Sequence, residues 1–170
     1  MVTYLTKQIV TSDLYIEPKD INSNLHQNIY NRLVQKVEGK CNHIGYVLKG
    51  SLEIVSKSPG TIIYINSINN VSYTLKYKCD ILQPSVGETI QCCIENITNA
   101  GVVAYVKFKD IIPDYPSDNT IQDTPVVCIV PLNRFEDPSQ LTRNQRIQVK
   151  VTAVRNRLNQ SNIQIVGQPV

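Results

Sequence analysis

The change of pattern at residues 84–88 constrains the fold of this chain more than any other feature. Before it, apolar and polar residues alternate over residues 71–81, which is the period of two of a strand with one buried face. After it come two further apolar runs, residues 90–97 and 102–108, separated by Asn99-Ala100-Gly101. The pattern predicts a long strand, a turn, and a hairpin that begins a small barrel.

Residues 1–84 predict one helix packed on an antiparallel sheet. Apolar residues recur at every fourth position over residues 21–37, with Asp20 or Ser23 as the expected cap at the start of the helix. Gly39 follows, and glycine commonly ends a helix in the left-handed conformation. Strands are expected at residues 8–17, 45–48, 52–55, 61–65 and 71–81. The order predicts an α+β domain, a curved antiparallel sheet with one helix on one face.

Residues 85–170 predict an all-β domain. Five strands are expected at residues 90–97, 102–108, 126–130, 147–154 and 163–166. The segment 110–124 is rich in Asp, Pro, Ser and Asn, and we expect it to be an exposed loop. Five short strands with one long excursion are typical of an OB-fold barrel. We therefore expect two domains, residues 1–84 and 85–170.

The composition is that of a globular protein, with 42% hydrophobic and 18% charged residues. The net charge of +3 is too small to predict a nucleic-acid-binding protein by itself. The five cysteines include no CxxC pair, and neither histidine lies at metal-ligand spacing from a cysteine. No apolar run approaches the roughly 20 residues that cross a bilayer. We expect an intracellular protein in the reduced state, without a bound metal and away from membranes.

The sequence offers no nucleophile with a neighbouring base, no glycine-rich phosphate loop and no acidic metal cluster, so we expect neither enzymatic activity nor a cofactor. OB-fold barrels bind single-stranded nucleic acid by stacking bases on aromatic rings over a basic groove. The candidates here are Tyr105, Lys107, Phe108, Arg143, Arg146, Lys150, Arg155 and Arg157. Tyr105 and Phe108 have opposite parity on a regular strand, so at most one ring can face the groove, and packing competes with stacking for each.

Several short motifs in a fixed order carry a resemblance to a known family. They are Val37-Glu38-Gly39-Lys40-Cys41, Gly45-Tyr46-Val47, Pro59-Gly60, Tyr73 through Leu75-Lys76-Tyr77-Lys78, Leu82-x-Pro84-x-x-Gly87-Glu88, and Asn99-Ala100-Gly101-Val102. Because these motifs occur in this order and spacing, the chain resembles the seventh-largest subunit of eukaryotic RNA polymerase II and its counterpart in the stalk of the archaeal RNA polymerase. The likeness is strongest over residues 33–105 and returns at residues 147–151 and 163–167.

The resemblance implies a non-catalytic stalk subunit of a DNA-directed RNA polymerase. Its N-terminal tip domain would dock on the polymerase core near the clamp, and its OB domain would lean toward the nascent transcript and bind RNA weakly. The resemblance also implies a second, helical stalk subunit as partner. By position, the core-docking residues would be Pro18, Lys19, Asp20, Ile21, Lys57, Ser58, Pro59, Gly60 and Thr61. The chain departs from the family pattern at residues 66–70, where relatives have a glycine-rich element, and at Val102 and Val103, where related barrels often carry an aromatic residue.

Two alternatives stay open at this point. One is a free-standing OB-fold RNA-binding module in translation or RNA decay, and the other is a scaffold protein in a different complex. The frequent use of Asn and Ile and the absence of Trp suggest AT-rich coding, as in some large DNA viruses that encode their own polymerase. We expect the nucleus as the site of action for a cellular protein, and the host cytoplasm, the viral factory and the virion for a viral one.

Overall fold

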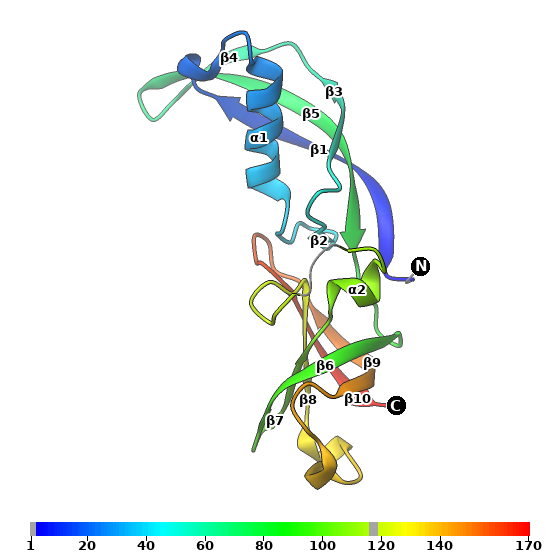
Figure 1. Ribbon diagram of the computed structural model, residues 1–170. Helices are drawn as coiled ribbons and strands as arrows, with labels where there is room; N and C mark the ends of the chain where they lie inside the picture. Colours follow the sequence, from blue (N-terminus) through cyan, green and yellow to red (C-terminus); the bar gives the residue numbers. More distant parts are fainter. Residues whose placement is uncertain (1–2, 116–118) are drawn as a thin grey trace. The chain divides into compact units, whose positions relative to one another are not determined.

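The computed structural model describes residues 3–115 and 119–170, and these form two compact units (Figure 1). The sheet unit consists of residues 7–38 and 47–80. The barrel unit consists of residues 3–6 and 39–46 together with the described residues from 81 onward. The functional division into residues 1–84 and 85–170 stays a prediction.

The long strand β5 (Ile68–Leu82) is the centre of a five-stranded sheet. Its partners are β1 (Leu5–Ile16), β2 (Tyr46–Val47), β3 (Glu53–Lys57) and β4 (Thr61–Ile65). Strand β5 lies between β1 and β2, and β3 and β4 pair antiparallel with separate parts of it. The predicted alternation is confirmed from Tyr73 onward, where every second residue as far as Ile81 is buried: Tyr73, Leu75, Tyr77, Cys79 and Ile81, while Val71 is half-buried.

Helix α1 (Leu25–Val37) lies across one face of this sheet and buries Ile29 and Leu33, which confirms the predicted sheet with one helix (Figure 1). The helix is followed by Gly39 with a φ of 70°, the left-handed residue that the sequence predicts. The helix begins at Leu25, so its predicted start at residue 21 is wrong.

The N-terminal boundary of α1 differs from the prediction for a local reason. Pro18–Asp20 forms a separate 3-10 turn, η1, in which Ile21 N donates to Pro18 O at 3.1 Å. The side chain of Asn22 then accepts from Asn24 N at 2.9 Å, a local bond that competes with helical geometry. Asn24 occupies the cap position, in place of Asp20 or Ser23.

The barrel unit contains a closed five-stranded barrel with the strand order β10-β8-β7-β6-β9. Its strands are β6 (Thr89–Thr98), β7 (Gly101–Tyr105), β8 (Val126–Val130), β9 (Arg146–Arg155) and β10 (Ile163–Pro169). Strands β8 and β10 run parallel, and the other neighbours run antiparallel. Apolar side chains from every strand fill the interior, among them Ile94, Ala104, Cys128, Val149 and Ile165. The architecture confirms the predicted barrel and is consistent with an OB-like domain.

The link between β7 and β8 departs from the prediction. Strand β7 ends at Tyr105, and Phe108 begins a short helix, α2 (Phe108–Ile111), where the sequence suggests a continuing strand. The side chain of Asn119 accepts from Phe108 N at 2.7 Å and donates to Val106 O at 3.1 Å. The hydroxyl of Thr124 donates to Val106 O at 2.8 Å. These two side chains are buried and satisfy the backbone beyond Tyr105, so the described residues of the predicted exposed loop, 110–115 and 119–124, are only partly exposed; residues 116–118 of that prediction lie outside the described residues.

All five cysteines are buried and free. Burial raises the pKa of the Cys41 and Cys79 thiols to about 11. These thiols act as small apolar side chains, as the sequence predicts for Cys41, Cys79 and Cys128. No helix in the described part of the chain has the length and apolar character needed to cross a bilayer.

Candidate docking and nucleic-acid surfaces

The first predicted docking segment, residues 18–21, is tied to helix α1 by charged side chains. Arg32 Nη2 lies 2.7 Å from Asp20 Oδ2 and 3.7 Å from Glu17 Oε1. The amide of Asn28 donates to Asp20 O at 2.9 Å. Beside these contacts is a pocket of about 260 Å³, lined by Asp20, Asn28, Asn31, Arg32 and Gln35. The segment thus presents a polar recess of defined shape to the solvent.

An exposed ion pair completes this segment. Lys19 Nζ lies 2.7 Å from Glu17 Oε2. The hydrogen bond from Lys19 lowers the pKa of the Glu17 carboxyl, and the same bond raises the pKa of Lys19. Both side chains are exposed, so the pair is screened by salt and contributes little to folding.

The second predicted docking segment, residues 57–61, connects β3 to β4 and is held to β5. Lys57 Nζ lies 4.6 Å from the centre of the Tyr73 ring. Ser58 N donates to Thr74 O at 2.9 Å, and Thr74 N donates to Ser58 Oγ at 2.9 Å. A Cβ atom on Gly60 would lie 2.6 Å from Val71 Cγ1, so a side chain at this position would displace its neighbours. The two docking segments are therefore separately built, one against α1 and the other against β5.

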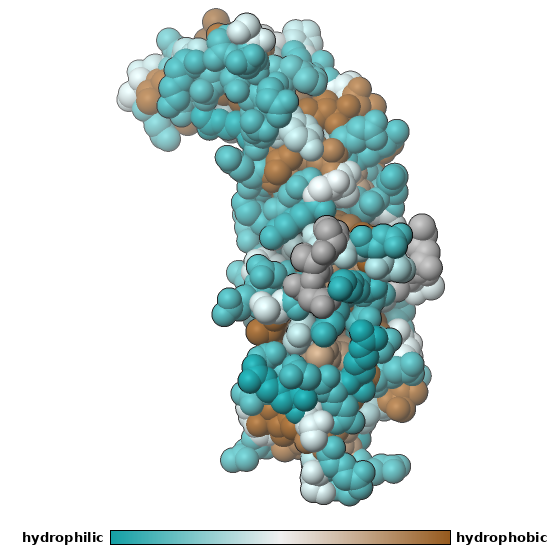
Figure 2. Space-filling model, viewed as in Figure 1, coloured by the Kyte–Doolittle hydropathy of each residue, from teal (hydrophilic) through white to brown (hydrophobic). Residues whose placement is uncertain are grey.

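The hairpin that joins β4 to β5 exposes apolar side chains that the sequence reasoning missed. Ile62 is 76% exposed and Tyr64 is 71% exposed, and Ile68 on the facing strand is also exposed. Asn66 and Ser67 both have positive φ, as in the two-residue turn of a tight hairpin. The run Ile62-Ile63-Tyr64-Ile65 lacks the alternation of a half-buried strand, and that is the signal in the sequence. Figure 2 shows hydrophilic residues over most of the face in view, with apolar residues in separate patches.

The two aromatic candidates for base stacking lie in the interior of the barrel unit. Tyr105 is 6% exposed and Phe108 is 3% exposed. The Phe108 ring stacks on Tyr115, with ring centroids 4.5 Å apart. Neither Tyr105 nor Phe108 presents a ring face to the solvent, so both rings serve packing. The parity argument fails because Phe108 is on helix α2 and not on strand β7.

The basic candidates divide into two groups. Arg146 Nη1 lies 3.3 Å from Asp110 Oδ1, Arg143 Nη2 pairs with Glu95 Oε1, and Lys107 is half-buried at the start of α2. Lys150, Arg155 and Arg157 are exposed. The cross-strand neighbours of Lys150 are Thr89 and Gln168, and that of Arg155 is Gln164.

Lys150 and Arg155 therefore place positive charge beside uncharged polar residues on the outside of β9, and Arg157 follows in the segment between β9 and β10. Such an arrangement suits contact with phosphate groups.

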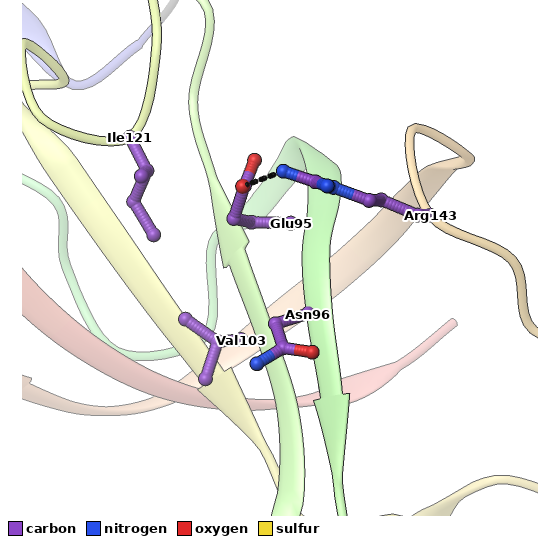
Figure 3. A pocket seen from close by; sticks show the side chains of 5 residues that line it. All are labelled: Glu95, Asn96, Val103, Ile121 and Arg143. Carbon is purple, nitrogen blue, oxygen red and sulfur yellow. Dashed lines mark hydrogen bonds and ion pairs between the residues drawn. The ribbon is translucent and has the colours of Figure 1, made fainter.

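A pocket of about 420 Å³ lies on the outer surface of strands β6 and β7, and among the described residues it is lined by Glu95, Asn96, Val103, Ile121 and Arg143 (Figure 3). Asn96 and Val103 are cross-strand partners. Arg143 belongs to the segment before β9, which is fixed to β6 by hydrogen bonds from Asn144 N to Ile94 O and from Ile94 N to Gln145 O.

Arg143 is the one predicted residue that lines this pocket, and the sequence reasoning missed the other four. The pairing of β6 with β7 shifts register between Ile94 and Asn96, where Glu95 lies, and the sequence carries no clear sign of this shift. In the described part of the chain, no group of three or more His, Cys, Asp or Glu side chains is placed to hold a metal ion.

Comparison with known proteins decides the family. No family model matches the chain. The DNA-directed RNA polymerase II subunit rpb7 of Dictyostelium discoideum is 30% identical over 149 residues, which are 84% of this chain and 83% of that protein. This chain belongs to the RNA polymerase II subunit 7 family. The resemblance inferred from the sequence motifs is thus confirmed.

Two other relatives agree with this family. A protein of Acanthamoeba polyphaga mimivirus, provisionally named as a DNA-directed RNA polymerase subunit, is 23% identical over 150 residues, 88% of this chain and 74% of that protein. The DNA-directed RNA polymerase II subunit 7 of Arabidopsis thaliana is 23% identical over 114 residues, 62% of each chain. The relatives of this chain therefore include a viral protein as well as cellular ones. The roles of individual residues in docking and RNA contact stay predictions.

Proposed function

We propose that this protein is a non-catalytic stalk subunit of a DNA-directed RNA polymerase that acts in transcription initiation and elongation. The observation that carries the proposal is the 30% identity to an RNA polymerase II subunit over 84% of the chain, which includes parts of both units. A free-standing RNA-binding module would share the barrel but would have no need of the sheet unit.

The tip domain, residues 1–84 in this proposal, docks on the polymerase core near the clamp through residues 18–21 and 57–61. Support comes from the way both segments are held in place while their outer surfaces stay open to solvent. The exposed hairpin side chains Ile62 and Tyr64 follow directly on Thr61 and add an apolar anchor. Large aromatic and aliphatic side chains of this kind often contribute most of the binding energy of an interface.

The barrel, within residues 85–170, contacts the nascent transcript weakly through phosphate groups. Lys150, Arg155 and Arg157 are the side chains best suited to this contact because they are exposed and the strand neighbours of Lys150 and Arg155 are uncharged. Arg143 and Arg146 already pair with Glu95 and Asp110, so they contribute less positive charge. Contact with the phosphate backbone of RNA does not depend on the RNA sequence, and it weakens as the salt concentration increases.

A second, helical stalk subunit is the expected direct partner within the polymerase. The compartment follows from the polymerase that the protein serves: the nucleus for a cellular enzyme, and the host cytoplasm, viral factory and virion for a viral one. The mimivirus relative and the bias toward Asn and Ile both support the viral possibility.

Affinity purification of the tagged full-length chain from its native source at moderate salt tests this function. We expect the large polymerase subunits to be recovered in near-equal amounts. Recovery of RNA or ribosomal proteins without polymerase subunits would contradict the proposal and favour a free RNA-binding module. A Lys57→Glu variant should recover less polymerase, whereas Lys49→Glu, a charge reversal at another exposed lysine of the sheet unit, should behave like the wild type.

A further inference from the structure

The pocket on the outside of β6 and β7 has the features of a nucleobase site. Its volume of about 420 Å³ is within the range of roughly 300–1,000 Å³ typical of small-molecule sites. Val103 and Ile121 are half-buried apolar walls, while Glu95, Asn96 and Arg143 supply the polar lining. Val103 is on the second strand of the barrel, and OB-fold barrels bind oligonucleotides on the face of their second and third strands.

The polar groups of this pocket are oriented by their own contacts. The Oδ1 atom of Asn96 accepts from Ile97 N at 2.9 Å, which leaves the Nδ2 group as the donor on the side of Val103 (Figure 3). Glu95 Oε1 is paired with Arg143 Nη2 (Figure 3). The pocket thus offers one amide donor and a carboxylate whose two oxygens can each still accept a hydrogen bond, because the contact with Arg143 uses one of about four lone-pair sites.

The ion pair between Arg143 and Glu95 also determines the net charge of the pocket lining. Arg143 neutralises Glu95, so the carboxylate does not repel an approaching phosphate as an isolated acid would. Contact with Oε1 uses one of the five donors of the guanidinium, and the remaining donors suit a phosphate oxygen. The pocket can therefore bind the edge of a base and the adjoining phosphate of the nucleic-acid backbone at the same time.

We infer that this pocket binds a guanine base, with Arg143 on the adjoining phosphate. Guanine presents two donors, N1–H and the N2 amine, to the Glu95 carboxylate, and its O6 atom, next to N1, accepts from Asn96 Nδ2. Adenine places an acceptor, N1, where guanine has a donor, so it opposes the carboxylate. Uracil has one donor and no amine on this edge. The inference rests on the proposed contact with RNA as the source of the base, and a free guanine nucleotide has the same chemistry.

Fluorescence anisotropy with the full-length protein tests the inference. The probes are short oligouridines with a single central guanosine, adenosine or inosine. We expect the guanosine probe to bind about 5- to 150-fold more tightly than the adenosine probe, the range of a good two-bond base contact. Inosine lacks the N2 amine and should bind between the two.

Glu95→Gln is the decisive variant because glutamine keeps the size of the side chain but offers one acceptor and one donor to the base. It should remove the preference for guanosine. Glu136→Gln, a matched change at an exposed glutamate of the same unit, should leave the preference intact. Thermal unfolding of both variants checks that they fold. Equal binding of guanosine and adenosine probes by the wild type, or a preference that survives Glu95→Gln, overturns the inference.

A second measurement separates this inference from the proposed function. The nucleotides 5′-GMP and 5′-AMP are titrated into methyl-labelled protein while the resonances of Val103 and Ile121 are followed by NMR. We expect shifts with GMP alone, and loss of those shifts in Glu95→Gln. GMP binding without any RNA binding would contradict the transcript contact but keep the guanine pocket. If neither GMP nor RNA affects these methyl groups, the pocket inference is wrong.

Discussion

The sheet unit and the barrel unit use polar side chains in opposite places. In the sheet unit, the polar contacts of the docking segments lie near the solvent, as in the pairs Arg32–Asp20 and Lys19–Glu17. In the barrel unit, Asn119 and Thr124 are buried and satisfy the backbone between β7 and β8. Exposed pairs contribute little to stability, and buried hydrogen bonds are costly to break. Substitutions should therefore unfold the barrel at its buried polar residues and alter binding at the surface of the sheet unit.

The largest effect is expected from Asn119→Ala in the barrel unit. It leaves the buried Phe108 N without its partner, at a cost of about 1–3 kcal/mol. It also removes one of the two hydrogen bonds to Val106 O, worth about 0.5–1.5 kcal/mol, while the bond from Thr124 remains. We expect the free energy of unfolding to fall by roughly 2–4 kcal/mol. Urea denaturation measures it, with the exposed Asn133→Ala as control. A loss no larger than that of the control would show that the two units do not differ in this way.

The next effect is expected from Tyr64→Ser at the hairpin of the sheet unit. Tyr64 is exposed, so stability should change by less than about 0.5 kcal/mol. The affinity for the polymerase should fall by about 2 kcal/mol if the side chain anchors the interface. Titration of the purified chain into polymerase that lacks this subunit measures the affinity. Leu158→Ser, an exposed apolar residue of the barrel unit, is the control, and equal losses in both variants would refute the assignment of docking to the sheet unit.

A smaller effect is expected from Lys150→Ala and Arg155→Ala on the outer surface of β9. Each removes about one phosphate contact, so the dependence of RNA affinity on salt should become shallower by roughly 0.7 in log–log slope per residue. Guanosine and adenosine probes should be weakened alike, because these residues contact only phosphate in the proposed complex. Titrations at several salt concentrations measure the slope. A slope unchanged in both variants would remove this surface from the proposed transcript contact.

The smallest effect concerns the exposed pair of Glu17 and Lys19. The hydrogen bond from Lys19 lowers the pKa of Glu17, so the pair stabilises the fold above the pKa of the unfolded state. That small contribution is lost as pH falls through the lower, folded pKa. Carboxyl-detected NMR titration should show Glu17 titrating below its ordinary range, and Lys19→Met should raise the midpoint. An unchanged midpoint in that variant would show that the ion pair does not form in solution.

Regular alternation made much of the fold predictable from the sequence. The limits of β4 and β8 agree with the predicted residues 61–65 and 126–130, and β5 extends the predicted strand by a few residues at its start. These elements depend on the apolar pattern of their own residues, with Gly or Pro near their ends.

Contacts between residues distant in sequence were not predictable. Helix α2 depends on Asn119, eleven residues beyond Phe108, and the late start of α1 depends on the side chain of Asn22. The outer pocket depends on a bulge in β6 and on Arg143, which is 48 residues from its partner Glu95. Charge count suggested Arg143 as a nucleic-acid contact, but its pairing with an acid and the walls of the pocket arise only in the folded chain.

Crosslinking mass spectrometry of the intact polymerase with this chain in place would test docking through the sheet unit most directly. We expect Lys19 and Lys57 of the sheet unit to crosslink to large polymerase subunits, whereas Lys150 of the barrel should crosslink to the nascent RNA or to nothing in the core. Crosslinks to the core from Lys150 alone, with Lys19 and Lys57 still reactive toward solvent reagents, would contradict docking through the sheet unit.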